Sequence, residues 1–336
     1  MIVTVTPNPS IDRTVTLTGP LTRGAVHRVS SVTTEPGGKG VNVARALTLA
    51  GVDATAVLPA PATDSLVAAL TASAVRFQCV PTTGAVRTNL AITEHDGTTT
   101  KVNEPGAPLD AAALDALTLA VISAAEAASW VVLSGSLPPG VPDHWYAHVV
   151  ALLAPYPCRV AIDTSEGPLA ALVASFDRAA PDLIKPNAEE LASVLGHSPE
   201  ALEAAVAQGD PEPVVAAARQ LVDRGVGAVL ATLGAAGAVL VDETGSWRAT
   251  PPPIAARSTV GAGDASLAGY LRADVGGAVP PQRLQMAVAY GSAAAALPGS
   301  ALPGSALPTP AQIDLNAVRV TPIAPISPTT NTKVSP

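Results

Sequence analysis

The chain has 336 residues, of which 48% are hydrophobic and 3% aromatic, and its formal net charge is −8. This length suffices for one large α/β core with a small appended lid, rather than several independent domains. The acidic balance argues against non-specific binding to nucleic acid or an anionic membrane, because both favour a basic surface. Cys79 and Cys158 lack paired spacing, which argues against a disulfide framework or a zinc site.

The N-terminal segment becomes polar and turn-forming at Pro7. It lacks the basic start and the apolar stretch of a signal peptide. Elsewhere no apolar run approaches the ~20 residues needed to span a bilayer. We therefore expect a cytoplasmic protein.

Short apolar runs alternate with Ala- and Leu-rich segments along most of the chain. This alternation predicts a mainly parallel sheet that is covered by helices on both faces. The strands that we expect in this sheet are 2–6, 54–58, 130–133, 160–162, 183–184 and 228–231.

Four further runs mix polar with β-branched residues, at 14–17, 26–32, 88–93 and 98–102. Asp96-Gly97 between the last two favours a hairpin. These runs fall in two insertions that flank the first helices, so we expect a small antiparallel β lid from about 12–33 and 86–102. One domain would then cover 1–316. The Pro-, Thr- and Ser-rich tail, 317–336, is expected to be disordered because it offers little apolar surface to offset the entropy of ordering.

The first predicted strand is followed by a turn-forming segment that ends at Asp12. Open parallel sheets place ligand contacts at strand ends, so Asp12 either accepts hydrogen bonds from sugar hydroxyls or simply forms a turn. A glycine cluster around Lys39 then opens a helix. Lys39 is followed by Gly40 rather than by Ser or Thr, which excludes a P-loop. The cluster forms either a plain turn or a pocket in which Lys39 and Asn42 donate hydrogen bonds.

Two later segments also follow predicted strands. Asn187 and Glu190 are three residues apart, so on a helix they would face the same side and could hold water-solvated Mg²⁺. The alternative is a capping box. The segment from Thr232 through Gly234 to Gly237 favours either a nucleotide shelf or a hairpin turn.

The segment Gly261-Ala262-Gly263-Asp264 precedes a helical run. Glycines at this place let the backbone approach an anion, and the free amides of the helix start point at it. Ser266 stands where a dinucleotide fingerprint has its third glycine, so that fingerprint is excluded. Asp264 would either take a proton from a hydroxyl that attacks the phosphate or cap the helix.

Two other patterns are set aside. His144 and His148 have helical spacing, but Trp145 replaces the Glu of a zinc protease. Ser134-Gly135-Ser136 lacks the Gly-x-Ser-x-Gly elbow of a hydrolase.

The combined motifs resemble the phosphofructokinase B branch of the ribokinase-like kinases, over about residues 1–316. Each motif is weak alone, whereas their order in one chain is highly specific. The chain departs from the family at 59–64, where a Gly-x-x-Gly stretch is common. The motifs that carry the resemblance are Asn8 with Asp12, Gly37 to Gly40 with Asn42, Asn103 to Gly106, Ser134 to Gly140, Lys185 to Asn187 with Glu190, and Gly261 to Asp264.

The resemblance implies a three-layer α/β/α sandwich and assigns roles to individual residues. Asp264 would be the catalytic base, and the amides of Gly261, Ala262 and Gly263 would form an anion hole. Asn187 and Glu190 would organise Mg²⁺, largely through water. The implied sugar-phosphate pocket comprises Asp12, Gly38, Lys39, Asn42 and Arg87. The implied nucleotide contacts are Lys185, Asn187, Thr232, Gly234 and Gly237.

The activity implied by the resemblance is ATP-dependent phosphorylation of D-fructose 1-phosphate at its 6-hydroxyl, with Mg²⁺ as cofactor. Phosphorylation of tagatose 6-phosphate or fructose 6-phosphate is an alternative within the family. An alternative from a different class is a catalytically silent sugar-phosphate sensor. The presence of Asp264, Asn187 and Glu190 together argues against it, because a sensor need not retain the residues for phosphoryl transfer. The resemblance also implies a homodimer through the lid, in which His27 and Arg28 reach the partner's site. The expectation of no nucleic-acid or membrane partner comes from the acidic net charge.

Overall fold

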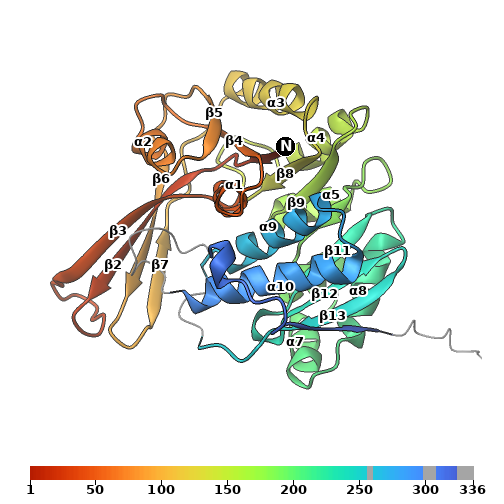
Figure 1. The fold of residues 1–336 in the computed structure, drawn as a ribbon. Helices are drawn as coiled ribbons and strands as arrows, with labels where there is room; N and C mark the ends of the chain where they lie inside the picture. The colour runs from red at the N-terminus through yellow and green to blue at the C-terminus, as the bar shows by residue number, and fades with distance from the viewer. Residues whose placement is uncertain (256–259, 298–307, 324–336) are drawn as a thin grey trace, which may run out of the picture.

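The computed structural model describes residues 1–255, 260–297 and 308–323, and it has three layers (Figure 1). Within these residues a ten-stranded sheet has the order β14-β13-β12-β11-β10-β9-β8-β1-β4-β5. Its parallel part contains every predicted strand of the core, together with β5. These strands are β1 (Ile2–Val5), β4 (Ala54–Pro59), β5 (Arg76–Val80), β8 (Trp130–Ser134), β9 (Arg159–Asp163), β10 (Leu183–Ile184) and β11 (Ala228–Thr232).

The central strands of the sheet are mostly apolar because both of their faces are covered. Val3 and Val131 belong to one hydrophobic cluster, whereas their neighbours Ile2 and Trp130 belong to the cluster on the opposite face. One face packs against α1 (Lys39–Leu49), α2 (Ser65–Ala72), α9 (Ala262–Val275) and α10 (Pro280–Ala296). The other packs against α3 (Ala111–Ala125), α4 (Trp145–Leu153), α5 (Glu166–Val173), α6 (Ala188–Leu195), α7 (Pro199–Ala207) and α8 (Glu212–Val222).

A second sheet stands off the main body at the lower left of Figure 1. Its strands, in the order β3-β2-β6-β7, form two antiparallel hairpins whose inner strands β2 and β6 pair in parallel. The second hairpin turns at Asp96-Gly97, as predicted, and the Asp96 carboxylate accepts a hydrogen bond from Thr98 N at 2.9 Å. The four strands are β2 (Ser10–Leu17), β3 (Val29–Gly37), β6 (Arg87–Thr93) and β7 (Thr99–Asn103).

Strand β3 differs from its predicted position at 26–32. It begins at Val29 and continues to Gly37, so the lid runs directly into α1. Pro36 lies inside this strand. Because β3 is an edge strand of the lid, its position tolerates a residue without a backbone N–H.

The C-terminal part of the sheet is antiparallel, and none of its three described strands after β11 was predicted. It comprises β12 (Ala238–Asp242), β13 (Gly245–Thr250) and β14 (Arg319–Pro322). The prediction of a disordered tail is therefore wrong for residues 319–323. Val318 is buried, and Ile323 packs against the core while its N–H donates to Ser246 O at 2.8 Å. Residues 324–336 of the predicted tail lie outside the described residues.

The contribution of β14 can be measured by comparing two truncated chains, one ending at residue 323 and the other at residue 318. We expect the shorter chain to lose on the order of 2 kcal/mol in free energy of unfolding relative to the longer one, because it loses the hydrogen bonds of β14 and the packing of Ile323. Urea denaturation of both chains measures this difference. Equal midpoints would show that β14 contributes nothing.

Candidate active site

Asp264 lies in the first turn of α9, which begins after Gly261. Gly261 has φ of +74°, a conformation that favours glycine. The first α-helical bond at this end runs from Ala265 N to Gly261 O at 2.8 Å, so the preceding amides have no partner inside the helix. The helix cap is Gly261 rather than Asp264, and this excludes the capping interpretation of the carboxylate. The segment has the geometry of an anion site with a carboxylate beside it.

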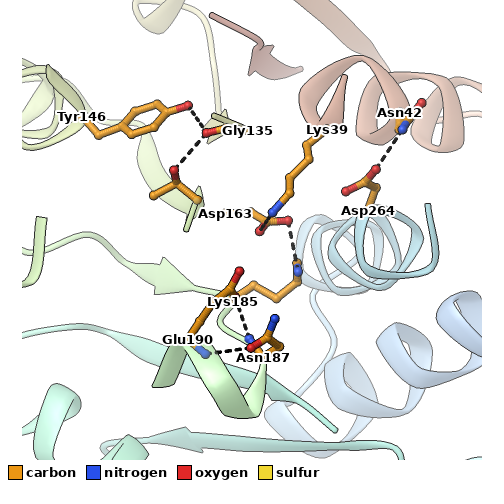
Figure 2. Close-up of polar contacts among 10 residues, drawn as sticks. Lys39, Asn42, Gly135, Tyr146, Asp163, Lys185, Asn187, Glu190 and Asp264 are labelled. Atoms are coloured by element: carbon orange, nitrogen blue, oxygen red, sulfur yellow. Dashed lines mark hydrogen bonds and ion pairs between the residues drawn. The ribbon is translucent and has the colours of Figure 1, made fainter. Parts of the chain in front are cut away.

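The Asp264 carboxylate is buried, with 7% of the residue exposed, and it accepts a hydrogen bond from Asn42 Nδ2 at 2.8 Å (Figure 2). Burial and the nearby negative charge of Asp163 raise its pKa to about 6, although Lys39, Asn42 and Lys185 act in the opposite direction. A general base works best when its pKa is close to the working pH. Asp264 is therefore suited to accept a proton near neutrality.

Three charged side chains form an ion-pair cluster beside Asp264 (Figure 2). Asp163 Oδ1 lies 2.8 Å from Lys39 Nζ, and Asp163 Oδ2 lies 3.0 Å from Lys185 Nζ. Burial would raise the pKa of Asp163, but the two ammonium groups hold it below its ordinary value. Lys185 also lies close to the first turn of α9, because a Cβ on Gly263 would stand 3.2 Å from the Lys185 Nζ. The cluster places two cations near the anion site.

Asp163 was not among the predicted site residues. Its signal was its place directly after the apolar run 160–162, because polar residues at the carboxyl ends of parallel strands gather at one edge of the sheet. Its two partners could not be found from spacing, because Lys39 is 124 positions away and lies on another element.

Asp12 lies on β2 where the lid meets the core. Its Oδ1 accepts hydrogen bonds from Ser10 Oγ at 2.7 Å and from Asn89 Nδ2 at 3.0 Å. A Cβ on Gly37 would stand within 2.4 Å of both carboxylate oxygens, so only glycine lets β3 pass this close. The carboxylate is thus held in a defined orientation, which agrees better with a ligand contact than with a plain turn.

Arg87 begins β6 and pairs in register with Ser10 of β2. Its NH1 donates to Glu104 O at 3.2 Å, and its Nε is buried without a partner among the described residues. Burial lowers the pKa of the guanidinium, against the attraction of Asp12 and Glu104. Arg87 also lines an open cavity between the lid and the core, together with Pro7, Asn8, Pro9, Pro59, Thr82, Gly84, Ala85, Val86, Ala107, Pro108, Leu109 and Pro138.

Lys39 and Arg87, both predicted to attract the sugar phosphate, have different partners in the structure. Lys39 is bonded to Asp163, and the charges of Asp163, Asp264 and Glu190 together raise its pKa above the ordinary value in spite of its burial. Lys39 thus belongs to the neighbourhood of Asp264. Its contact with the sugar phosphate remains a prediction, as do those of Gly38 and Asn42.

Asn187 and Glu190 form the capping box that the sequence left open as an alternative. Glu190 N donates to Asn187 Oδ1 at 2.7 Å, and Asn187 N donates to Glu190 Oε2 at 2.8 Å. The pair lies beside the ion-pair cluster, below Lys185 in Figure 2. A capping box uses part of each group only, so the two side chains retain acceptor capacity towards water.

Thr232 ends β11 next to Asn187, with which it forms an isolated parallel bridge. The hairpin interpretation of the following residues is confirmed, because β11 and β12 are antiparallel and Leu233 N donates to Gly237 O at 2.8 Å. Gly237 has φ of +96°, and a Cβ there would stand 2.0 Å from Ala249 O, so both its backbone conformation and its packing favour glycine. Nucleotide contacts by Thr232, Gly234 and Gly237 remain a prediction.

The described residues contain no group of three or more His, Cys, Asp or Glu side chains that could enclose a metal ion. The donor set near Asp264 nevertheless fits Mg²⁺, because this ion keeps several waters and needs only one or two carboxylates beside substrate phosphates. Among the helices in the same residues, none combines the length and hydropathy needed to cross a membrane.

Comparison with known proteins identifies the family of this chain. Residues 5–306 match the pfkB family of carbohydrate kinases. A 1-phosphofructokinase from Xanthomonas campestris pv. campestris is 38% identical, over 81% of this chain and 83% of its own. A 1-phosphofructokinase from Rhodobacter capsulatus is also 38% identical, over 86% of this chain and 88% of its own.

Solved structures confirm the predicted fold class. Phosphofructokinase-2 from Escherichia coli, in complex with substrates and products, is 30% identical, with a TM-score of 0.81 over 90% of this chain and 94% of its own. Ribokinase from Thermotoga maritima shares the fold at 17% identity, with a TM-score of 0.70 over 94% of this chain and 98% of its own. The chain belongs to the pfkB family of carbohydrate kinases.

Proposed function

We propose that this chain transfers the γ-phosphoryl group of ATP to the 6-hydroxyl of D-fructose 1-phosphate, giving fructose 1,6-bisphosphate and ADP. The observation that carries the chemistry is the buried Asp264 carboxylate, with its pKa raised to about 6, at the amino end of α9. The substrate follows from the relatives named 1-phosphofructokinase. ATP and a sugar phosphate as substrates favour a cytoplasmic location.

In the proposed reaction, Asp264 accepts the proton of the 6-hydroxyl as that oxygen forms a bond to the γ-phosphorus. The bond between the γ-phosphorus and the bridging oxygen breaks, and ADP leaves with that oxygen. The amides of Gly261, Ala262 and Gly263 at the helix start would stabilise the charge on the transferred group. Lys39 and Lys185 add positive charge next to this position.

Asn187 and Glu190 would hold Mg²⁺ through water. When bound, the ion supplies charge neutralisation for the phosphates of ATP. The chain's own contribution is to fix both side chains: the capping box holds them at the start of α6, and Thr232 pairs with Asn187. Lys185, Thr232, Gly234 and Gly237 would contact the nucleotide at this end of the site.

At the opposite end, Asp12 would accept hydrogen bonds from sugar hydroxyls, Gly38 and Asn42 would line the same pocket, and Arg87 would attract the 1-phosphate. We further propose that the lid pairs with a second copy of this chain and that His27 and Arg28 reach the partner's site. The exposed apolar residues on the lid support this pairing; they are Val26, Val29, Val32 and Val102.

A coupled assay of ADP release tests the substrate directly. With fructose 1-phosphate, fructose 6-phosphate and tagatose 6-phosphate compared at equal concentration, we expect fructose 1-phosphate to give the highest kcat/KM. Preference for either 6-phosphate would reassign the substrate but keep the phosphotransfer. ATP-dependent turnover of none of them, in a protein that still binds fructose 1-phosphate, would favour a sensor.

The role of Arg87 can be tested by its replacement with alanine. Arg87→Ala should raise the KM for fructose 1-phosphate by roughly 10- to 100-fold, because the variant loses a charge-assisted hydrogen bond that contributes ~1.5–3 kcal/mol. The KM for ATP, measured in the same assay, is the internal control and should stay within about twofold. A rise in the KM for ATP alone would place Arg87 on the nucleotide side.

A further inference from the structure

Asn8 is buried at the end of β1 and connects two segments that are distant in sequence. It lies between Pro7 and Pro9, and 6% of the residue is exposed. Its Nδ2 donates to Pro105 O at 3.0 Å and to Ser136 Oγ at 3.2 Å. The carbonyl of Pro105 can only accept, so the amide nitrogen must face it, and its two hydrogens serve both acceptors. We call these three residues the Asn8 latch.

The lid side of the latch leads to Arg87. Pro105 follows Glu104, whose carbonyl accepts from Arg87 NH1 at 3.2 Å and whose carboxylate accepts from Thr88 N at 2.8 Å. Gly106 has φ of +95°, and a Cβ there would stand 2.2 Å from Asn8 Oδ1. The segment after β7 therefore packs directly on Asn8, and it carries the acceptor that orients the arginine.

The core side of the latch is rigid. Ser136 follows Gly135, whose carbonyl accepts from Tyr146 Oη at 2.8 Å and from Thr164 Oγ1 at 2.9 Å (Figure 2). The N–H of Gly135 donates to Asp163 O at 2.9 Å. Hydrogen bonds from α4 and from the end of β9 thus fix the loop to which Asn8 is bonded.

We propose that Asn8 is a positioning residue that sets the affinity for the sugar phosphate, by holding the Arg87-bearing part of the lid against the Ser136 loop. Asn8 and Arg87 line the same cavity, and without the latch only the lid's own contacts would orient the guanidinium. The inference rests on the proposed function, because it takes Arg87 to bind the phosphate of the substrate. Within the described residues, no hydrogen bond joins the latch to Lys185 or Asn187 at the proposed nucleotide end.

The test is Asn8→Ala, with Asn316→Ala as the matched control. Asn316 is an exposed asparagine that lies outside the cavity and outside the latch. We expect Asn8→Ala to raise the KM for fructose 1-phosphate roughly 5- to 10-fold, as for one or two lost hydrogen bonds, with the KM for ATP within about twofold. Asn316→Ala should leave both constants unchanged. An equal rise in both constants for Asn8→Ala would overturn the proposal.

Gly106→Ala perturbs the latch from the lid side. It is a second test of the proposal that can be used if Asn8→Ala does not fold. Its added Cβ would displace the segment from Asn8, so we expect the same selective rise in the KM for fructose 1-phosphate.

Hydrogen–deuterium exchange gives a readout that does not depend on the substrate. Amides at 99–106 should exchange faster in Asn8→Ala than in the wild type. If the wild-type chain fails to phosphorylate fructose 1-phosphate, the proposed function fails, yet this comparison still decides whether the latch exists. Unchanged exchange at 99–106 would refute it.

Discussion

Asp264→Asn is expected to lower kcat by at least ~10²-fold, the lower end of what a positioned general base contributes. Asparagine preserves the shape of the side chain and can still accept the hydrogen bond from Asn42, but it cannot take a proton from the sugar hydroxyl. Steady-state kinetics at saturating substrates measures the loss. Near-normal turnover in the purified variant would remove Asp264 from the role of base.

The pH profile and stability of the same variant are its controls. Asp264 must be ionised to accept a proton, so the wild-type kcat should fall as the pH drops through about 6, and this limb should be absent in Asp264→Asn. The folded pKa of about 6 lies above the ordinary 3.8, so ionisation of Asp264 disfavours the folded state at neutral pH. The variant should therefore be at least as stable as the wild type at pH 7. A less stable variant would mean that its low activity reflects unfolding.

Asp274→Ala should have the largest effect on stability, a loss of about 3 kcal/mol in the free energy of unfolding. The Asp274 side chain is fully buried and accepts hydrogen bonds from Trp130 Nε1 at 2.8 Å and from Arg159, while Arg283 NH1 lies 3.0 Å from its Oδ1. Its removal leaves the indole N–H without an acceptor and two guanidinium groups without their anion. We choose the lower end of the usual range because the Arg159 side chain is 42% exposed and can turn to water.

Asp53→Ala is the matched control for this prediction. Asp53 pairs with Arg76, but the side chains are 53% and 62% exposed, and exposed ion pairs contribute at most ~1 kcal/mol. Urea denaturation midpoints of the two variants should therefore differ clearly. If Asp274→Ala were no more destabilising than Asp53→Ala, the buried cluster would not be a stabilising element.

The core of the fold was predictable because its strands are covered on both faces and are therefore continuous apolar runs, as in β1 and β8. The strands at the two ends of the sheet could not be predicted in this way. Strand β5 carries Arg76 and Gln78, and β13 carries Arg248, so neither gives an apolar run. Strand β14 belongs to a segment whose composition favours disorder, and its order comes from pairing with β13 and from the packing of Val318 and Ile323.

The candidate site, like the fold, has one part that could be predicted from the sequence and one part that could not. Asp264 and its glycines were found because an anion cradle at a helix start is a local pattern of a few consecutive residues. The partnership of Asp163 with Lys39 and Lys185 depends on three separate elements that meet only after the sheet has formed. No spacing in the sequence encodes it, so the charge environment that tunes Asp264 had to come from the structure.

The bond between Asn42 and Asp264 joins residues 222 positions apart, on α1 and α9. Contacts of such high sequence separation carry a large loop-closure cost, and the chain is synthesised from its N-terminus. The residues of the proposed sugar-phosphate pocket are thus encoded early in the chain, and the proposed base is encoded late. Catalytic competence arises only when both ends of the chain have come together, so activity regained during refolding reports completion of the whole domain rather than collapse of either half.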